Sequence, residues 1–478
     1  MRRNTNVALA CLGLLLGTAG CDSFLTGNKL SNNPNLPTEA SVRQLFIGVQ
    51  AGQFAFQEGT VAMMMCEWVQ ACSAANGRFV QQAAQYKFDE GSNIGANGGD
   101  WISVYDGGGL IDIRQVEDKA TANNDRVWLG IAKVWEAFTM GTASSMWGNI
   151  PYTEAVSGNT APVLDDRFAI LASLQTLLDA AITDLQSGTG AGPGDADLVF
   201  GGDPAAWVRV AWTLKARYYM QTAESLSATG STAAYTNAIT AALNGINSTA
   251  GDFKSFHTLN TNERNMWAQF QLSSGFGTDL EAGKAMVDYM KARNDPRLAD
   301  YYCQNAGGGY GGDDFNVVVP ADSISQFLCA PLPARFAEDA RIPYVTYAEN
   351  ELILAEAYAQ TGDEPSARTH LNNAYAVVPG LASTAGTATG AALMDSIMSE
   401  KWVSMFQNIE SISDYRRTCL PALTPSQNAA GFTQIPGRLF YPQNERNVNP
   451  NIPDGSAQLA AHGFRNPGDV HGCSGDLR

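Results

Sequence analysis

The stretch from residue 341 to residue 379 has the pattern of two antiparallel helices joined by a tight turn, and it constrains the fold more than any other stretch. Gly362 marks the end of the first helix, and Asp363, Glu364 and Pro365 are typical of a helix start. Small and apolar residues recur at spacings of three and four, which predicts a broad buried face on the first helix: Ala348, Leu352, Ala355 and Ala359.

The same stretch fits the tetratricopeptide pattern of a tyrosine, spaced alanines, a large apolar residue and a proline. The matching residues are Tyr358, Ala367, Leu371, Ala374 and Pro379. One helix pair of this kind cannot bury its own apolar face, so we expect neighbouring pairs stacked on it. The alternative is an ordinary antiparallel helix pair in an all-helical protein. Both interpretations predict a mainly α fold.

The first 39 residues are expected to lie outside the folded body. Arg2 and Arg3 precede an apolar run too short to span a bilayer, and small residues lead into Cys21, which resembles a bacterial lipoprotein signal. We expect a signal peptide over 1–20, a lipid such as palmitate on Cys21, and a flexible tether over 21–39. The alternative is a secretory signal with a chance cysteine. No later segment is expected to be long and apolar enough to cross a membrane, so the lipid alone would anchor the chain.

The charge balance argues against a nucleic-acid partner. The chain of 478 residues carries a net charge of −17 and a pI of about 4.6, and it has no run of lysine and arginine. Binding to nucleic acid or to an anionic membrane depends on such clusters. Hydrophobic residues make up 45% of the chain, enough to bury a large core without metals or disulfides.

Six cysteines remain after Cys11 in the signal and Cys21 are set aside. Their even number permits disulfides outside the cytoplasm, and the alternative is six buried thiols. The expected pairs, which spacing alone does not fix, are Cys303–Cys329 and Cys419–Cys473. A bond between Cys66 and Cys72 requires a helix break, because six helical residues advance about 9 Å and a disulfide needs Cα atoms within about 7 Å.

The remaining chain is predicted to form a single helical domain over 40–478. Two stretches without helical periodicity, 244–277 and 300–340, are expected to form long irregular insertions on the ligand face. The predicted helices, besides the pair above, cover 40–71, 101–119 with a break at 107–109, 125–147, 167–185, 204–224, 232–243, 279–293 and 391–417.

Five separated segments resemble one family, the SusD/RagB-like outer-membrane nutrient-binding lipoproteins. They are GNIPYTEA (148–155), DLVFGGDPAAWVRVAWTLKARYYM (197–220), YAENELILAEAY (347–358), EKWVSMFQNIESISDYRRT (400–418) and RLFYPQNERNVNPN (438–451). The resemblance implies a helical fold with tetratricopeptide-like pairs. It also implies a lipid-anchored, non-enzymatic protein on the outer face of the outer membrane. Such a protein captures an oligosaccharide or peptide and delivers it to a SusC-like TonB-dependent transporter.

Catalytic and metal-binding patterns are not expected. The four histidines form no zinc motif, and the loop with Asp195 and Asp197 lacks the order of a calcium-binding loop. Glu349 and Glu356 lie about 10 Å apart along one helix, too far for the roughly 5 Å of a retaining glycosidase. We interpret them as the polar edge of a buried helix, and we expect no catalytic residues, metal or cofactor.

Sugar binding needs flat aromatic rings beside amides and carboxylates, and two places supply that mixture. The first is a loop-to-helix junction with Asn97, Asp100, Trp101 and Tyr105, and the second is a glycine-rich insertion with Tyr301, Tyr302, Tyr310 and Phe315. The rings of Trp101 and Tyr105 fit a core equally well, whereas the insertion tyrosines are expected to be exposed. The alternative functions are a tetratricopeptide-type scaffold for another protein and a glycan-processing enzyme.

Overall fold

The computed structural model describes residues 40–76, 79–80, 85–92, 99–223, 225–273, 276–277, 279–383, 386–427, 434–460, 466 and 473. The predicted signal, Cys21 and the tether lie outside the described residues, so they stay predictions. The chain divides into two units, Met1–Gln44 and Leu45–Arg478. In the first, the Ser41 hydroxyl donates a hydrogen bond of 2.8 Å to Oε1 of Gln44. All that follows concerns the second.

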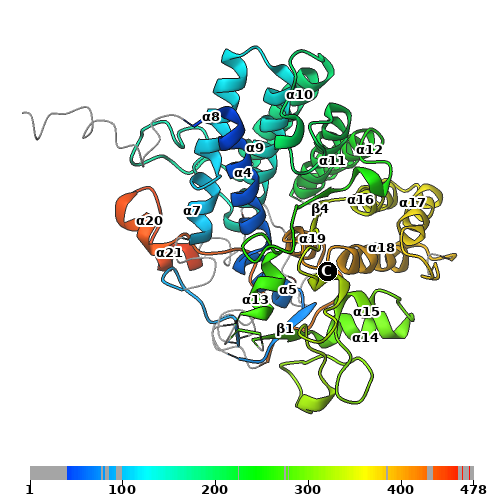
Figure 1. Ribbon diagram of the computed structural model, residues 1–478. Coiled ribbons are helices and arrows are strands. Elements are labelled where there is room, and N and C mark those ends of the chain that lie inside the picture. Colours follow the sequence, from blue (N-terminus) through cyan, green and yellow to red (C-terminus); the bar gives the residue numbers. More distant parts are fainter. Residues whose placement is uncertain are drawn as a thin grey trace, which may run out of the picture. The chain divides into compact units, whose positions relative to one another are not determined.

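Three helix pairs form the main body of the second unit, and they stack side by side (Figure 1). The pairs are α9 (Arg126–Trp147) with α10 (Arg167–Gln186), α11 (Pro204–Ala223) with α12 (Ala228–Ala242), and α16 (Tyr347–Gln360) with α17 (Glu364–Ala376). Across the pairs, α10 packs on α11 and α12 packs on α16. The mainly α fold of stacked pairs predicted from the sequence is therefore confirmed.

The α16–α17 pair forms for the reasons that its sequence suggests. Asp363 caps α17 by accepting a hydrogen bond from the backbone of Ser366, and Gly362 takes the left-handed φ of +87° that the turn requires. Its buried face joins both helices to α18 (Gly390–Ser404) through Leu352, Ala355, Ala367, Leu371, Ala374 and Leu393. Small alanines at the contact allow the helices to approach closely.

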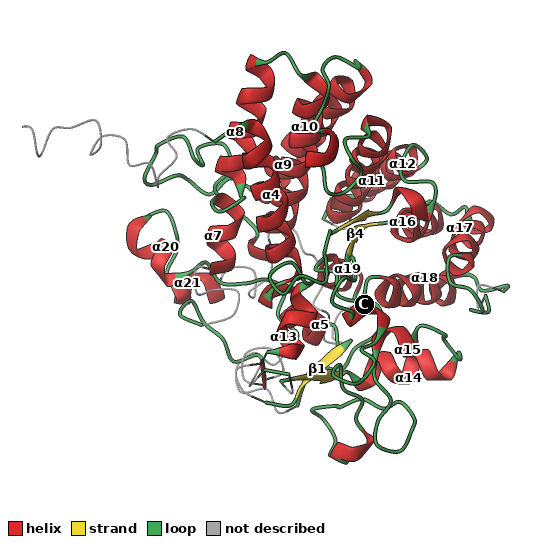
Figure 2. Cartoon of the chain, viewed as in Figure 1, coloured by secondary structure: helices red, strands yellow, loops and turns green. Residues whose placement is uncertain are grey.

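Further helices and short strands surround this stack (Figure 2). The helices are α4 (Val42–Glu58), α5 (Thr60–Trp68), α7 (Gly99–Tyr105), α8 (Leu110–Ala122), α13 (Met266–Leu272), α14 (Lys284–Ala292), α15 (Leu298–Tyr301), α19 (Glu410–Thr418), α20 (Gln443–Val448) and α21 (Gly455–Ala460), with 3₁₀ turns at Gly194–Ala196, Thr249–Gly251, Ala321–Ser323 and Ala334–Phe336. Two antiparallel strand pairs complete the described part: β1 (Cys72–Ala74) with β3 (Leu280–Ala282), and β2 (Phe253–Lys254) with β4 (Pro343–Val345).

Two predicted helices are each divided in the structure. The helix expected over 40–71 breaks at Gly59, which precedes α5, and the helix expected over 391–417 breaks between α18 and α19. Glycine has the weakest helix propensity apart from proline, and Gln407 adopts a left-handed φ of +68° in the second break. Apolar periodicity continues through both breaks, so the pattern alone predicted single helices.

Three disulfides join the six cysteines, as Cys66–Cys72, Cys303–Cys329 and Cys419–Cys473. The two predicted pairs are confirmed. The third forms because α5 ends at Trp68 and the backbone turns at Gln70 with a φ of +55°, which brings the Cα atoms of Cys66 and Cys72 to 5.2 Å. This is the helix break that the bond requires.

Helix α10 is long and apolar enough to cross a membrane by length and composition, so the expectation that no later segment qualifies is wrong in those terms. The helix packs against both α9 and α11. Its Asp184 accepts hydrogen bonds from Arg126 and Lys133, the latter at 2.7 Å. These contacts explain the apolar composition of α10 as that of a helix packed on both sides.

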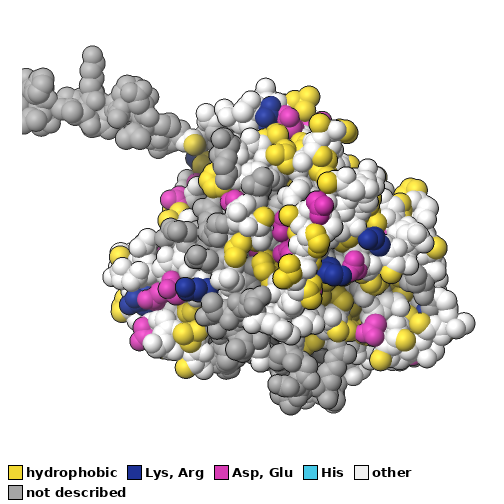
Figure 3. Space-filling model, turned by 90° about the horizontal axis from the view of Figure 1, so that it is seen from below, with side chains coloured by type: hydrophobic (Ala, Val, Ile, Leu, Met, Phe, Trp, Pro, Cys, Tyr) yellow, Lys and Arg dark blue, Asp and Glu magenta, His cyan; other side chains and the backbone are white. Residues whose placement is uncertain are grey.

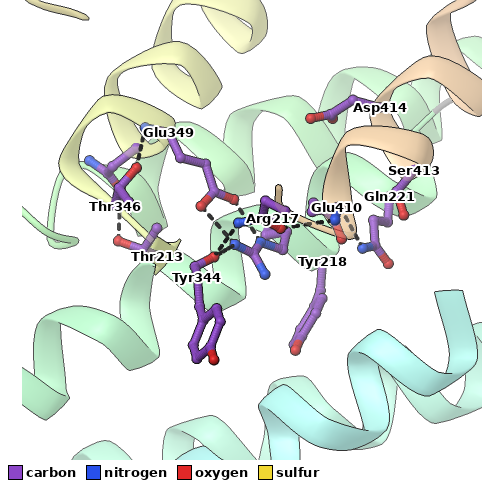
Figure 4. A network of polar contacts seen from close by, with 12 residues as sticks. Thr213, Arg217, Tyr218, Gln221, Tyr344, Thr346, Glu349, Glu410, Ser413 and Asp414 are labelled. Carbon is purple, nitrogen blue, oxygen red and sulfur yellow. Dashed lines mark hydrogen bonds and ion pairs between the residues drawn. The ribbon is translucent and has the colours of Figure 1, made fainter. Parts of the chain in front are cut away.

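Glu349 and Glu356 are not a polar edge, and that prediction is wrong. Both carboxylates are buried in ion pairs, Glu349 with Arg217 at 2.6 Å and Glu356 with Arg417. Figure 4 shows the first pair, with Arg217 on α11 facing Glu349 on α16. Buried charges are tolerated where they are paired and hydrogen-bonded. The acids of α16 therefore join helices and are not available to a ligand.

Candidate functional site

Tyr301 and Tyr302 lie in the core, so the expectation that they are exposed is wrong. The ring of Tyr301 stacks on Phe406 with centroids 4.4 Å apart, and its hydroxyl donates to the Val403 carbonyl. The hydroxyl of Tyr302 donates to the carbonyl of Ala71 at 2.8 Å. Backbone acceptors satisfy the polar ends of both rings, which allows their burial. Neither ring presents a face to a ligand.

The predicted junction site also belongs to the packed interior. Trp101 is buried edge-on against Trp147, and the half-buried Tyr105 donates its hydroxyl to the Pro151 carbonyl at 3.0 Å. Asp100 accepts a hydrogen bond from the Thr60 hydroxyl. Asn97 lies outside the described residues. The core interpretation of Trp101 and Tyr105, left open by the sequence, is therefore the one that the structure supports.

Tyr310 and Phe315 are half-buried on the glycine-rich insertion. The backbone carbonyl of Tyr310 accepts a hydrogen bond from Lys291 on α14 at 2.8 Å. Phe315 lies beside a hollow of about 210 Å³ that we call the cleft. Of the predicted rings that the structure describes, Phe315 is the one that lines this cleft.

Five stretches far apart in the sequence line the cleft, which lies beside β1 and the start of α14, two elements labelled in Figure 1. They are the end of α5 with β1, the irregular segment with Tyr86, the start of α14, the loop after Gly312, and the segment that follows Leu420. The lining residues are Glu67, Gln70, Cys72, Ser73, Tyr86, Gly283, Lys284, Ala285, Asp288, Asp313, Asp314, Phe315, Asn316, Ala422, Leu423, Thr424 and Ser426. Two aromatic rings, two amides and four carboxyls are thus combined on one surface.

Hydrogen bonds between these stretches hold the cleft in shape. Ser73 on β1 donates to Asp313 at 2.9 Å, which joins the strand to the insertion. Gln70 donates to the carbonyl of Thr424 at 2.6 Å. Burial raises the pKa of the Tyr86 phenol to about 12, so this ring stays neutral and presents a hydroxyl.

Two carboxyls of the cleft, those of Glu67 and Asp313, have perturbed pKa values. Burial raises the pKa of Glu67 well above its ordinary value, and the acids Glu281 and Asp279 raise it further. Burial also raises the pKa of Asp313, with a smaller contribution from Asp314 that the hydrogen bond from Ser73 opposes. Perturbed pKa values cluster at functional sites more often than elsewhere.

Sequence reasoning missed Glu67, Tyr86 and Asp313. Glu67 did carry a signal, because it is an acid inside the apolar run from Val61 to Val69. Tyr86 and Asp313 lie in irregular segments. Asp313 bridges Gly283, next to β3, and the pairing of β1 with β3 links residues more than 200 positions apart, whereas the hydroxyl of Tyr86 accepts a hydrogen bond from the backbone of Ser426.

A second and more open hollow, of about 660 Å³, lies at the ends of α10 and α12 beside the start of α11. Trp212 and Arg209 line it, and Lys215 lies 5.6 Å from the centroid of the Trp212 ring. It contains one aromatic ring and no acidic side chain. The cleft offers the fuller set of groups for a polar ligand.

Metal-binding and catalytic arrangements are not evident in the part of the chain that the structure describes. No group of three or more histidine, cysteine, aspartate or glutamate side chains is placed to hold a metal there. Asp197, considered for calcium, accepts hydrogen bonds from Trp207 at 2.8 Å and from the backbone of Gly202 at 2.9 Å. Its carboxylate organises the turn before α11.

Comparison with known proteins identifies the fold and the family. A family model of SusD-like proteins, described as "Starch-binding associating with outer membrane", matches residues 34–442. No curated protein sequence matches the chain.

Solved structures match the chain over nearly all of its length. A chitin-binding protein is 21% identical at a TM-score of 0.71, covering 90% of this chain and 100% of that chain. A chitin-binding SusD homologue from Flavobacterium johnsoniae is 18% identical at 0.72, covering 90% and 99%. A SusD-like protein from Bacteroides thetaiotaomicron is 21% identical at 0.70, covering 90% and 97%. At these identities the matches establish a shared fold.

Proposed function

The chain belongs to the SusD-like family, and from that premise we propose that it is a non-enzymatic binding protein that captures an oligosaccharide in the cleft. The family description names starch, and two of the structurally similar proteins are named for chitin binding. These names supply the class of ligand. The cleft supplies the place for it on this chain.

The observation that carries the proposal is the combination of groups around the cleft. The half-buried ring of Phe315 offers a face for the apolar side of a pyranose, while the hydroxyl of the buried Tyr86 and the side chains of Gln70 and Asn316 offer donors and acceptors for its hydroxyls. All four lie on irregular segments or at the end of a helix, where binding groups are commonly placed. The volume of about 210 Å³ suits one or two sugar rings of a longer chain.

The two acids of α16 that the sequence weighed for hydrolysis are not available to a substrate. The two glutamates of α16 that the sequence singled out are engaged in buried ion pairs with Arg217 and Arg417. A glycosidase needs two carboxyl groups free to face the scissile bond. We therefore propose capture without chemical change.

The proposed setting is the cell surface. A lipid on Cys21 would anchor the protein in the outer membrane with its folded body outside, and the captured ligand would pass to a SusC-like TonB-dependent transporter. The acidic chain supports this setting, since it lacks the basic clusters that bind nucleic acid. On the face drawn in Figure 3, lysine and arginine side chains occur in small groups beside acids, and no extended basic patch is visible.

Titration calorimetry with the full-length protein tests the function. Starch-derived, chitin-derived and cellulose-derived tetrasaccharides are titrated into wild type, Phe315→Ala and Trp212→Ala, with folding checked by circular dichroism. We expect at least one sugar to bind, Phe315→Ala to weaken it about tenfold or more, and Trp212→Ala to leave it unchanged. Loss of binding in Trp212→Ala alone would move the site to the second hollow.

Two further outcomes separate the alternatives. Release of shorter sugars during incubation would indicate an enzyme. Absence of binding to every saccharide at millimolar concentration would favour the protein-binding scaffold. Extraction in mild detergent followed by affinity purification tests the transporter partner, which we expect to be recovered together with the protein.

A further inference from the structure

The cleft contains more acids than bases among its lining residues. Its one base, Lys284, is already paired with Asp288 through a hydrogen bond from Nζ to Oδ2. The carboxyls of Glu67, Asp313 and Asp314 have no cationic partner among the described residues. A neutral sugar would leave that imbalance in place, whereas a cationic group would compensate it.

Glu67 adds to this lining a buried acid without a hydrogen-bond partner among the described residues. Its side chain is 5% exposed, and neither carboxyl oxygen has a hydrogen-bond partner in the part of the chain that the structure describes. Its neighbours Glu281 and Asp279 carry charge of the same sign. A buried polar group without a partner lowers stability, so such groups are uncommon unless they serve a purpose.

An organic cation fits this arrangement better than a metal ion. The described residues contain no cluster of three or more metal-ligating side chains, at the cleft or elsewhere. An ammonium group donates hydrogen bonds to separate carboxyl oxygens and does not need a fixed coordination shell. The neighbouring half-buried ring of Phe315 at the same time offers the surface that a sugar ring requires.

We propose that the cleft is selective for amino sugars that carry a free ammonium group, such as oligomers of glucosamine, over neutral or N-acetylated sugars. This inference rests on the proposed function, because it names the ligand class of the same site. The ammonium group is held by the unpaired carboxyls of Asp313 and Asp314, with Glu67 behind them. The sugar rings lie against Phe315.

Competitive and direct calorimetry with four ligands tests the selectivity. The ligands are the glucosamine tetramer, its N-acetylated form, the glucose tetramer and trilysine, titrated at low and at moderate salt. We expect the glucosamine tetramer to bind at least tenfold more tightly than the N-acetylated form, with the difference shrinking as salt screens the charges.

Matched variants locate the effect. Asp314→Asn removes one charge and keeps the acceptor that Asn316 uses for its backbone hydrogen bond of 2.8 Å. Asp118→Asn removes the same charge from an exposed position on α8, which lies far from β1 and α14 in Figure 1. We expect Asp314→Asn to lower the affinity for the glucosamine tetramer about tenfold and to leave the affinity for the neutral sugars unchanged. We expect Asp118→Asn to change neither affinity.

The outcomes separate this inference from the proposed function. Equal or tighter binding of the N-acetylated or glucose tetramer overturns the selectivity and leaves saccharide capture standing. Binding of trilysine as tight as that of the glucosamine tetramer overturns the assignment to sugars. Absence of binding by all three saccharides overturns both proposals.

Discussion

The guanidinium of Arg217 on α11 meets the carboxylate of Glu349 on α16 side by side, with Nε 2.6 Å from Oε1 and Nη2 2.7 Å from Oε2. The same Nη2 donates to the carbonyl of Tyr344 at 2.6 Å. Glu410 on α19 lies close by and accepts a hydrogen bond from Gln221 at 2.7 Å (Figure 4). Three helices from separate parts of the chain thus share one buried polar network.

Removing one partner of that pair should be costly. We expect Glu349→Ala to lower the free energy of unfolding by about 3–5 kcal/mol, because the Arg217 charge stays buried without its counter-ion. The double variant Arg217→Met with Glu349→Leu should lose much less, since no uncompensated charge remains. Urea unfolding of Arg217→Met, Glu349→Leu and the double variant gives the comparison. Additive losses in the double variant would contradict the coupling.

Replacing Glu67 should change how stability depends on pH. The folded-state pKa of Glu67 is raised by burial above its unfolded value of about 4.3, so wild type loses stability as pH rises from that value through the folded-state pKa. Glu67→Gln does not titrate. The free energy of unfolding of the variant, relative to that of wild type, should therefore rise by about 1.4 kcal/mol for each pH unit within that window. Below the window the difference should not change with pH.

Thermal unfolding between pH 4 and pH 8 measures this difference. Glu263→Gln provides the control, because hydrogen bonds from Thr258 and Asn260 lower the pKa of this exposed acid. The window in which its stability depends on pH lies below the unfolded pKa of about 4.3, so the difference in free energy of unfolding between this variant and wild type should stay constant from about pH 5 to pH 8. A constant difference between wild type and Glu67→Gln across the range would show that Glu67 is not perturbed.

Two glycines in helices should respond to alanine in opposite ways. A Cβ on Gly141 of α9 would lie 2.2 Å from the hydroxyl oxygen of Tyr218, so Gly141→Ala forces α9 and α11 apart. We expect Gly141→Ala to lower the free energy of unfolding by about 1–3 kcal/mol. Gly48 of α4 has open space around its Cβ position, and Gly48→Ala should gain about 0.5–1 kcal/mol from helix propensity. Urea unfolding tests this: relative to wild type, the midpoint should fall for Gly141→Ala and rise for Gly48→Ala.

The disulfides should contribute unequally. Cys419–Cys473 closes a separation of 54 residues and Cys66–Cys72 one of 6, and the loop-entropy model assigns them about 4 and about 2 kcal/mol. Paired serine substitutions, Cys419→Ser with Cys473→Ser and Cys66→Ser with Cys72→Ser, should lower the melting temperature in that order. The reverse order would indicate that strain or residual structure outweighs the loop-entropy effect.

The helix pairs could be predicted from local sequence because their signals are local. Gly362, Asp363 and the apolar stripe of α16 specify a turn and a buried face within one stretch. The breaks at Gly59 and after Met405 escaped prediction, since apolar residues continue on both sides of each. Periodicity reports which residues are buried and not where the helix axis changes direction.

The site was harder to predict than the fold, for a physical reason. Tyr301 and Tyr302 look like surface aromatics beside glycines, yet backbone carbonyls from distant segments accept their hydroxyl hydrogens and allow burial. Phe315 was found because it stands in an irregular stretch. Glu67 and Tyr86 line the same cleft, but the tertiary fold brings them there, and residue spacing in the sequence does not predict it.

The bond between Cys66 and Cys72 spans the turn that carries Glu67 and Gln70, and Cys72 and Ser73 stand at its far end. One wall of the cleft is thus a closed covalent ring, fixed before any solute arrives. A visiting molecule need not order this wall, so less of the interaction energy is lost to immobilising it. The oxidising conditions that form this disulfide would therefore affect the affinity of the protein for its ligand as well as its folding stability.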